Sequence, residues 1–285
     1  ELIFPEIFIS LSIMFLLILG VFKKNSSKII HNISILVLLI TAVITFNETF
    51  RINPTNLFNE SIVIDYLSSF MKIITLIAAF VVLLISTNYL RVFKIFKIEY
   101  PILILSSVLG MMIMISSNDL IVFYMGLELQ SLGLYVLATF NRDQLKSSEA
   151  GLKYFVLSAL SSGLLLYGCS LIYGFTGSTN FDYISTQFNA SEYALTFGIV
   201  FVLVGLAFKI SAVPFHMWAP DVYEGSPTSV TLFFTMVPKI AALTVFIRFL
   251  YVPFLNLIDQ WQIILIFISI ASMLFGAIAA IGQKN

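Results

Sequence analysis

The feature that most constrains this chain is a series of long apolar windows separated by polar segments. About 20 consecutive apolar residues let a helix cross the hydrocarbon core of a bilayer. Of the whole sequence, 59% is hydrophobic and only 11% is charged. The pattern predicts an all-α integral membrane protein with about nine transmembrane helices, near residues 7–22, 33–46, 66–87, 101–117, 119–140, 149–175, 193–213, 228–250 and 260–282.

The segments between the windows are polar and carry most of the basic residues. Residues 47–65 and 176–192 contain Asn, Ser and Thr without an apolar period, so we expect loops there. Lysines and arginines outside the windows mostly follow odd-numbered windows, which places those connections on the cytoplasmic or matrix side. They are Lys23, Lys24, Lys28, Arg91, Lys94, Lys97, Arg142, Lys146 and Lys284, whereas Arg51 and Arg248 follow even-numbered windows.

The composition excludes several classes of function. Fifteen basic and fifteen acidic residues give a net charge of zero, so the chain has no polycationic surface for nucleic acid. One cysteine and two histidines are too few for iron–sulfur, zinc or haem ligation, and we expect no metal site. The sequence also has no glycine-rich nucleotide-binding motif. Redox or nucleotide chemistry linked to this protein must therefore be carried by another chain.

Charged residues inside the windows need a reason, because an ionised side chain at mid-bilayer costs about 2.5–3.5 kcal/mol on insertion scales. Glu128 lies about 13 Å and Lys239 about 16 Å into their windows, near the middle of a core about 30 Å thick. Lys209 lies deep in the seventh window. Each of the three is part of a structural ion pair, a side chain that snorkels to the interface, or functional, and the depth favours function.

Two further lysines leave more than one interpretation open. Lys153 begins the sixth window, and Glu149 lies four residues earlier. The two form either an ordinary interfacial ion pair or the inner mouth of a charge relay. Lys72 has no acidic partner in its own window and lies seven residues after Asp65, so a structural role is favoured there.

Prolines accompany the two deepest lysines. Pro238 directly precedes Lys239, and Pro214 follows Lys209. A proline inside a helix removes a backbone donor, and the freed carbonyls need water or protein partners. Each proline marks either a packing kink or a broken helix where water reaches the lysine, as in ion transporters. A Glu–Lys pair there can act as a switch, because a close carboxylate keeps the proton on the lysine.

Three stretches and one short motif carry a resemblance to a known family. They are Gly126-Leu-Glu-Leu-Gln-Ser-Leu132, Ser148-Glu-Ala-Gly-Leu-Lys-Tyr-Phe155, the long stretch 208–227 and Pro238-Lys239-Ile240. The chain resembles the subunit 2 family (subunit N in bacteria) of respiratory complex I, the proton-pumping NADH:ubiquinone oxidoreductase. The resemblance extends from Pro5 to Lys284.

The resemblance implies a membrane-arm subunit that takes part in proton translocation through a mid-membrane charge relay. In this family helices four to eight form an antiporter-like five-helix unit with a broken seventh helix. Glu128 matches the family's fifth-helix glutamate, Lys209 the lysine of the broken helix and Lys239 the central lysine of helix eight. Lys153 matches a sixth-helix lysine tied to proton input.

The same resemblance implies a division of the chain into three parts. Residues 1–98 hold three N-terminal transmembrane helices, 99–252 the five-helix unit, and 253–285 the first helix of a second, inverted repeat. The rest of that repeat is missing, together with its exit-side lysine. We therefore expect either a split gene, with a separate chain carrying the remaining helices, or a fragment.

The resemblance also implies the partners and cofactors. The expected partners are other membrane-arm subunits of complex I, the separate chain and membrane lipids, with no nucleic acid. NAD, FMN, iron–sulfur clusters and ubiquinone belong to other subunits, and none is expected on this chain.

Two other functions and two locations stay open. A subunit of a multi-subunit Na+/H+ antiporter shares the Glu–Lys–Lys set, and an anchor that no longer pumps is a third reading. The amino-acid sequence of the stretch 208–227 favours the oxidoreductase, so this chain would be a subunit of an H+-translocating enzyme. The many Ile, Phe, Lys and Asn residues suggest an AT-rich genome and a mitochondrial inner membrane, with the bacterial plasma membrane as the alternative.

Overall fold

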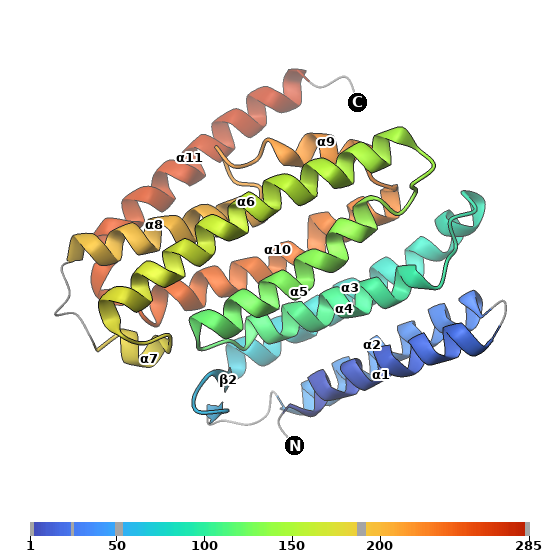
Figure 1. Ribbon diagram of the computed structural model, residues 1–285, viewed down its shortest axis with the longest axis horizontal. Helices are drawn as coiled ribbons and strands as arrows, with labels where there is room; N and C mark the ends of the chain where they lie inside the picture. Colours follow the sequence, from blue (N-terminus) through green and yellow to red (C-terminus); the bar gives the residue numbers. More distant parts are fainter. Residues whose placement is uncertain (1–2, 24–25, 49–53, 187–191, 283–285) are drawn as a thin grey trace.

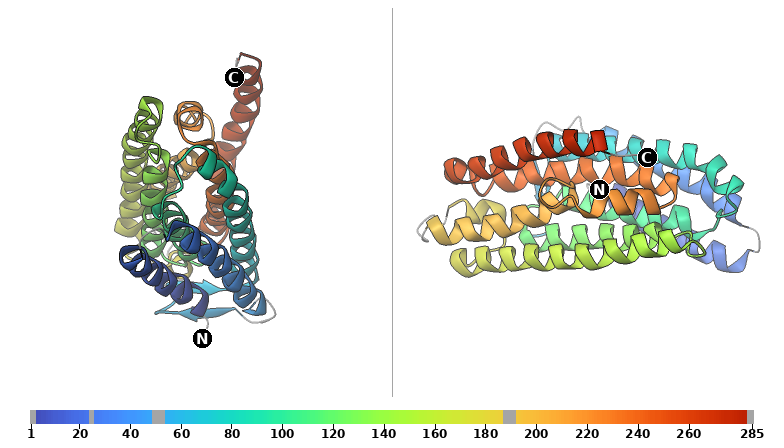
Figure 2. Two further views of the ribbon diagram at one scale, coloured as in Figure 1. Left: turned by 90° about the vertical axis from the view of Figure 1, so that its right-hand side faces the viewer. Right: turned by 90° about the horizontal axis from the view of Figure 1, so that it is seen from above.

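The long helices lie side by side along one axis (Figure 1) in a computed structural model that describes residues 3–23, 26–48, 54–186 and 192–282. The N-terminal helices form one edge of the bundle and the C-terminal helix forms the opposite edge, as the two further views confirm (Figure 2). Lys24, Arg51 and Lys284, used above to orient the chain, lie outside the described residues.

A helix lies on every predicted window. The helices are α1 (Phe4–Phe22), α2 (Ser27–Glu48), α3 (Tyr66–Val92), α4 (Glu99–Ile115), α5 (Leu120–Ala138), α6 (Leu145–Thr176), α8 (Glu192–Lys209), α10 (Thr228–Tyr251) and α11 (Ile258–Gly282). In the described part of the chain, seven helices are long and apolar enough to cross a membrane, whereas α4 and α8 are shorter. The all-α membrane fold is therefore confirmed, and the number of spans stays a prediction.

The two segments predicted as loops contain short elements. Strands β1 (Thr55–Leu57) and β2 (Ile62–Ile64) form an antiparallel hairpin, and α7 (Phe181–Ile184) is a single helical turn. The expectation of plain loops was wrong at the hairpin, because a run of three β-branched residues favours a strand. The backbone N–H of Val63 donates to the Ser116 carbonyl at 2.8 Å, so the hairpin lies against the turn before α5.

The seventh window is broken, and it breaks earlier than predicted. Helix α8 ends at Lys209 rather than near residue 213, and Ser211 adopts a left-handed backbone with φ of 57°. A residue before proline disfavours the helical region, which helps to end the helix ahead of Pro214. The chain resumes as α9 (Trp218–Gly225), with the intervening turn held to α11 by a 3.0 Å bond from Val213 N–H to the Ser272 hydroxyl.

Glycines let α4 and α5 approach until their backbones touch. A Cβ atom on Gly126 would lie 2.8 Å from the Met114 backbone nitrogen and 2.9 Å from the Gly110 carbonyl. A Cβ atom on Gly110 would lie 2.5 Å from the Gln130 backbone nitrogen. Small residues at such contacts are what close packing of membrane helices requires. This contact fixes the position of α5, which carries Glu128.

The end of α10 is tied to the start of α3 by an ion pair between a buried arginine and a partly exposed aspartate. Asp65 caps α3, accepting from the Ser68 backbone N–H at 2.8 Å. The Nη2 atom of Arg248 donates to both Asp65 carboxylate oxygens, at 2.7 and 2.9 Å, and the arginine is 4% exposed. This pair sets the position of α10, which carries Lys239.

Replacing Gly126 by alanine tests the close contact of α4 and α5. We expect a loss of about 1–3 kcal/mol of stability, because the new methyl group meets backbone atoms that cannot rotate away. The measurement is the temperature at which the full-length subunit unfolds within its assembled complex. Gly163→Ala in α6 is the matched control, because its Cβ atom would meet nothing within 4 Å. Equal melting of the two variants would contradict the packing argument.

The Asp65–Arg248 pair predicts a dependence of stability on pH. Burial alone would raise the pKa of the Asp65 carboxyl, but Arg248 and the hydrogen bonds from Ser68 and Arg248 outweigh it, so this pKa lies below its ordinary 3.8. The pair's contribution is therefore complete above pH 3.8 and is lost as the pH falls through the lowered pKa.

Asp65→Asn should remove that pH dependence and destabilise the chain by about 3 kcal/mol near neutral pH, because Arg248 keeps a buried charge without a counterion. Thermal unfolding measured from neutral to acidic pH provides the check. A variant that melts like the wild-type chain at every pH would show that the pair does not hold α10.

Candidate functional site

The ammonium of Lys209 is held by neutral groups only. Its Nζ atom donates to the Ser131 hydroxyl of α5 and the Ser158 hydroxyl of α6, both at 2.7 Å. It also lies 5.9 Å from the centre of the Tyr135 ring, and the Tyr135 hydroxyl donates to Ser158 at 2.7 Å. Lys209 is 7% exposed, and in the described ranges no carboxylate forms an ion pair with it.

Glu128 lies near Lys209 without touching it. Ser131 and Tyr135 follow Glu128 at three and seven residues along α5, so the three side chains share one helix face. The Glu128 carboxyl acts electrostatically on Lys209, and its Oε1 atom is buried with no hydrogen-bond partner among the described residues. In this arrangement the Glu128 carboxylate and the Lys209 ammonium form no contact ion pair.

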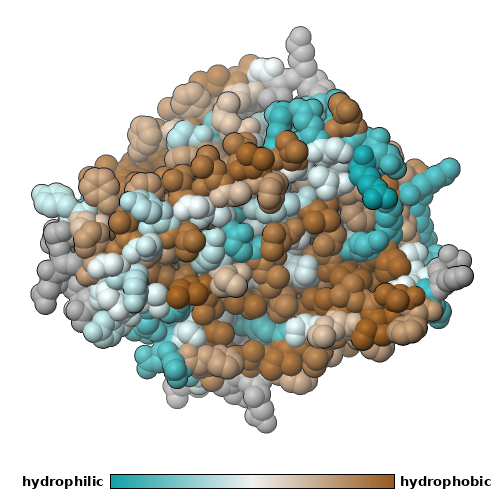
Figure 3. Space-filling model, viewed as in Figure 1, coloured by the Kyte–Doolittle hydropathy of each residue, from teal (hydrophilic) through white to brown (hydrophobic). Residues whose placement is uncertain are grey.

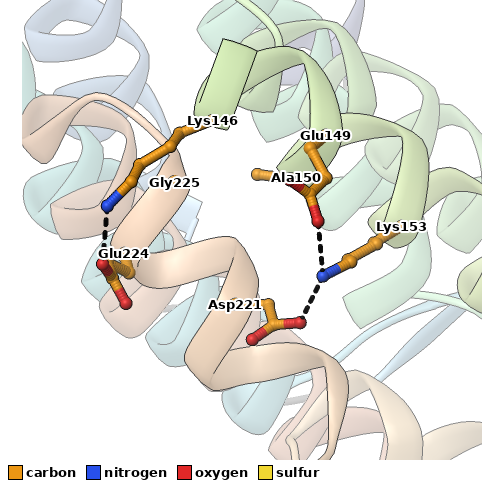
Figure 4. Close-up of a pocket in the computed structure, with 7 residues that line it drawn as sticks. All are labelled: Lys146, Glu149, Ala150, Lys153, Asp221, Glu224 and Gly225. Carbon is orange, nitrogen blue, oxygen red and sulfur yellow. Dashed lines mark hydrogen bonds and ion pairs between the residues drawn. The ribbon is translucent and has the colours of Figure 1, made fainter.

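Lys153 lies at the exposed end of α6, in an ion-pair network with α9. Its Nζ atom is 2.8 Å from Glu149 and 2.7 Å from Asp221 (Figure 4). Lys146 and Glu224 form a second bridge between α6 and α9, at 3.1 Å. The five acidic and basic side chains of these two bridges border a cavity of about 130 Å³.

In Figure 3 hydrophilic side chains gather over α9 and the first turns of α6, beside a largely hydrophobic surface. The Lys153 side chain is 41% exposed there. The interfacial ion pair considered in the sequence is present, and Asp221 is the second partner.

Lys239 lies on α10, away from the other predicted residues. Its ammonium is 5.6 Å from the centre of the Tyr223 ring, and among the described residues no carboxylate pairs with it. It opens onto an apolar pocket of about 510 Å³ between α3 and α10. The other lining residues are Met71, Ile74, Thr235, Met236, Ile240 and Leu243.

A row of aromatic rings separates Lys209 from Lys239. The row consists of Tyr135, Tyr154, Trp218 and Tyr223, with successive ring centres 5.1, 4.7 and 5.8 Å apart. Lys209 lies over the ring at one end of this row, and Lys239 lies over the ring at the other end. Cation–π contacts stabilise a buried ammonium without a counterion. The structure thus links the two lysines through one cluster, but no direct hydrogen bond joins them.

Sequence reasoning missed the residues that hold these lysines. Ser131 is one helical turn after Glu128, which is a signal, but serine is common throughout α6 and nothing in the sequence singles out Ser158. The partner of Lys72 was missed as well. It is Glu6 of α1, whose carboxylate lies 2.5 Å from the Lys72 ammonium, with both side chains buried.

Comparison with known families decides which kind of protein this is. The family model described as NADH:quinone oxidoreductase/Mrp antiporter, TM, matches residues 117–285, more than half of the chain. The chain belongs to this family. Within it, the chain is 75% identical over 283 residues to NADH-quinone oxidoreductase subunit N of Pelagibacter ubique (strain HTCC1062), across 99% of this chain and 60% of that relative. The chain therefore spans less than two thirds of the relative's length.

Solved structures agree with the family assignment. A chain of respiratory complex I from Thermus thermophilus with bound aureothin is 29% identical, with a TM-score of 0.75 over 86% of this chain and 52% of that one. A chain of the Mrp complex from Dietzia sp. DQ12-45-1b has a TM-score of 0.84 over 98% of this chain and 54% of that one. At 21% identity the second match shows the fold alone.

These matches confirm the resemblance to the subunit 2 family of complex I and the multi-pass membrane location. The Pelagibacter relative is bacterial, so the bacterial plasma membrane fits this member of the NADH:quinone oxidoreductase/Mrp antiporter family better than the mitochondrial inner membrane.

Proposed function

We propose that this chain belongs to the membrane arm of an NADH:quinone oxidoreductase and takes part in proton translocation. The observation that carries the proposal is the buried Lys209 ammonium, held by two serine hydroxyls at the break of a membrane helix. An ammonium is costly in this environment, and intramembrane charges are by default functional. The identity to subunit N of the bacterial enzyme supports the choice of complex.

The neutral cage lets Lys209 exist with or without its proton. An ammonium has three donors, and Ser131 and Ser158 accept two of them. Because a hydroxyl both accepts and donates, the same serines can rotate to donate to a neutral amine. No contact ion pair has to be broken when the proton leaves, so release does not lose the Coulomb energy of such a pair.

Glu128 supplies the control over this step. Its carboxyl lies one helical turn before Ser131 and already acts on Lys209 through space. Movement of the carboxylate toward Lys209 favours the ammonium, and its withdrawal or protonation favours the amine. A change at the neighbouring subunit that displaces Glu128 would therefore drive the proton off Lys209.

Lys153 and Lys239 complete the proposed relay. Lys153 is the uptake residue, since it is exposed and lies on α6 five residues before Ser158, about 7.5 Å along the helix axis. Glu149 and Asp221 provide alternative proton acceptors beside it. Lys239 is the residue beyond the aromatic row, and we assign it the next step of transfer.

The division of the chain is also part of the proposal. We assign residues 1–98 to an N-terminal three-helix part, 99–252 to the proton-translocation unit and 253–285 to the start of a second repeat. Helix α11 supports the last assignment, because nearly all of its apolar surface is exposed in the described residues. We propose that further helices cover it, carried by a separate chain or by more of the same polypeptide.

The remaining components follow from the complex. We propose that NAD, FMN, iron–sulfur clusters and quinone bind to other subunits, and that other membrane-arm subunits and lipids surround this one. A subunit of a Na+/H+ antiporter is the second candidate, favoured by the fold match to the Mrp complex.

Lys209→Ala in the full-length subunit should nearly abolish proton uptake that NADH oxidation drives into inverted membrane vesicles, because the relay loses its central amine. Uptake by the wild-type enzyme should not depend on sodium, which separates the oxidoreductase from the antiporter. Lys97→Ala, at an exposed lysine outside the helices, is the control and should pump normally. Normal pumping by Lys209→Ala with normal assembly would exclude the proposed role.

The paired change Ser131→Ala and Ser158→Ala should slow proton uptake about tenfold without removing any charge, since losing hydrogen bonds of about 1.4 kcal/mol in total gives that factor. The measurement is the initial rate of NADH-driven uptake, normalised to the amount of assembled subunit. Ser161→Ala, one turn further along α6, is the matched control. Equal rates for the pair and the control would show that the serines only fill space.

A further inference from the structure

The backbone turn that ends α8 satisfies the hydrogen-bond donors of the first residues after Lys209. The N–H of Ser211 donates to the Phe208 carbonyl at 3.0 Å, and the N–H of Ala212 donates to the Ala207 carbonyl at 2.9 Å. With Ser211 in the left-handed region, these two bonds form a Schellman motif, a common end of a helix. Helix α8 therefore supplies acceptors as far as Ala212 and no further.

The next donor, the N–H of Val213, is satisfied by another helix. It donates to the Ser272 hydroxyl of α11 at 3.0 Å, and Pro214 after it has no N–H. The Ser272 hydroxyl donates its own proton to the Ile268 carbonyl at 2.6 Å, so its lone pairs remain to accept from Val213. Val213 is buried, and a buried N–H in a membrane protein needs a partner within the protein. The Ser272 hydroxyl provides that partner.

Ser272 lies at one of two places where α11 is buried against the bundle. In this helix, which the structure describes completely, the buried residues are Trp261 near its start and Ala271. The Trp261 indole donates to the Phe254 carbonyl at 2.9 Å and so attaches the start of α11 to the segment after α10. The second place, at Ala271 and Ser272, lies against the break that follows α8.

The loop between α8 and α9 has a separate attachment at its base. The Trp218 indole of α9 donates to the Phe208 carbonyl of α8 at 2.9 Å, and the two rings stack with centres 5.4 Å apart. This contact closes the loop of residues 210–217 on itself. Ser272 adds an attachment from a third helix, and it acts on the middle of the loop, at Val213.

Loss of the Ser272 hydroxyl would reach Lys209 through the backbone. In a continuing α-helix the N–H of Val213 would donate to the Lys209 carbonyl, four residues earlier. Without its acceptor on α11, this buried N–H would compete for carbonyls at the end of α8. Rewinding the turn in this way would rotate the Lys209 side chain relative to Ser131 and Ser158, whose hydroxyls accept from its ammonium at 2.7 Å.

We propose that Ser272 is a positioning residue for proton transfer at Lys209, because its hydroxyl holds the break after α8 in the shape that directs the amine to its two serines. The inference deepens the proposed function and rests on it, since the direction of the amine matters for translocation only if Lys209 carries a proton. Ser272 does not contact the amine, and it acts through Val213 and the turn at Ser211.

Removing the hydroxyl tests the proposal in the full-length subunit of the assembled complex. Ser272→Ala should slow NADH-driven proton uptake into inverted vesicles about fivefold, which corresponds to about 1 kcal/mol on the barrier. Ser272→Thr keeps the hydroxyl and should restore the rate. Ser269→Ala is the matched control on the same helix, because the exposed Ser269 hydroxyl donates to the Ile266 carbonyl of α11 itself. This control should pump like the wild-type enzyme.

A combined variant separates positioning of Lys209 from a general structural role. If Ser272 acts through the serines at the amine, adding Ser272→Ala to Ser131→Ala and Ser158→Ala should leave uptake at about the tenfold loss expected for the serine pair. Independent effects would multiply to a loss of about fiftyfold. The measurement is the initial rate of uptake, normalised to the amount of assembled subunit.

Three outcomes would overturn the proposal: wild-type rates in Ser272→Ala, no recovery in Ser272→Thr, or a fiftyfold loss in the combined variant. If Ser272→Ala does not assemble, Ser272→Cys replaces it, because a thiol has similar size and accepts hydrogen bonds weakly. That variant should slow uptake about twofold, and a wild-type rate would count against the proposal. Normal pumping by Ser272→Ala with loss of pumping in Lys209→Ala refutes the positioning role alone, whereas normal pumping by Lys209→Ala refutes the proposed function.

Discussion

The cost of placing an ammonium group in a hydrocarbon environment governs the central part of this structure. Lys209 is the last residue of a helix, its ammonium donates hydrogen bonds to two serine hydroxyls, and it lies over an aromatic ring. Each of these features lowers the cost of the charge without fixing it in an ion pair. The contrast with Lys72 is informative, because that lysine is equally buried but contacts the Glu6 carboxylate. A salt bridge favours the charged lysine, whereas the serine hydroxyls at Lys209 can accept from an ammonium or donate to an amine.

Helix α6 connects the surface with this interior. It carries Lys153 in the exposed ion-pair network, Tyr154 in the aromatic row and Ser158 at the Lys209 ammonium, all within six residues. Helix α9 runs beside α6 and contacts both the ion-pair network and the end of α8. Asp221 contacts Lys153, and the Trp218 indole donates to the carbonyl of Phe208, which precedes Lys209, at 2.9 Å. The exposed ion-pair network and the buried Lys209 side chain are therefore both supported by α6 and α9.

The helices and the charges within them could be predicted from the sequence. Bilayer thickness sets the length of an apolar window, and a charged residue inside such a window is visible directly. The contacts of those charges could not, since they depend on which helices are neighbours. Ser131 is visible as one turn beyond Glu128, but Ser158 belongs to another helix, and Glu6 lies 66 positions from Lys72. The helix break was placed four residues too late because Pro214 marks the obstruction, whereas the backbone turns already at Ser211. The family resemblance located the four relay candidates without showing that Lys209 and Lys239 are separated by aromatic rings.

The bond between Val213 and Ser272 has a mechanical consequence. Helix α11 makes few other contacts in the described chain, yet this bond attaches it to the turn that begins directly after Lys209. A sideways displacement of α11 would be transmitted over four residues to the end of α8, where it would alter the distance between the amine and its serines. The least buried of the long apolar helices is thus attached directly to the turn that follows the buried Lys209.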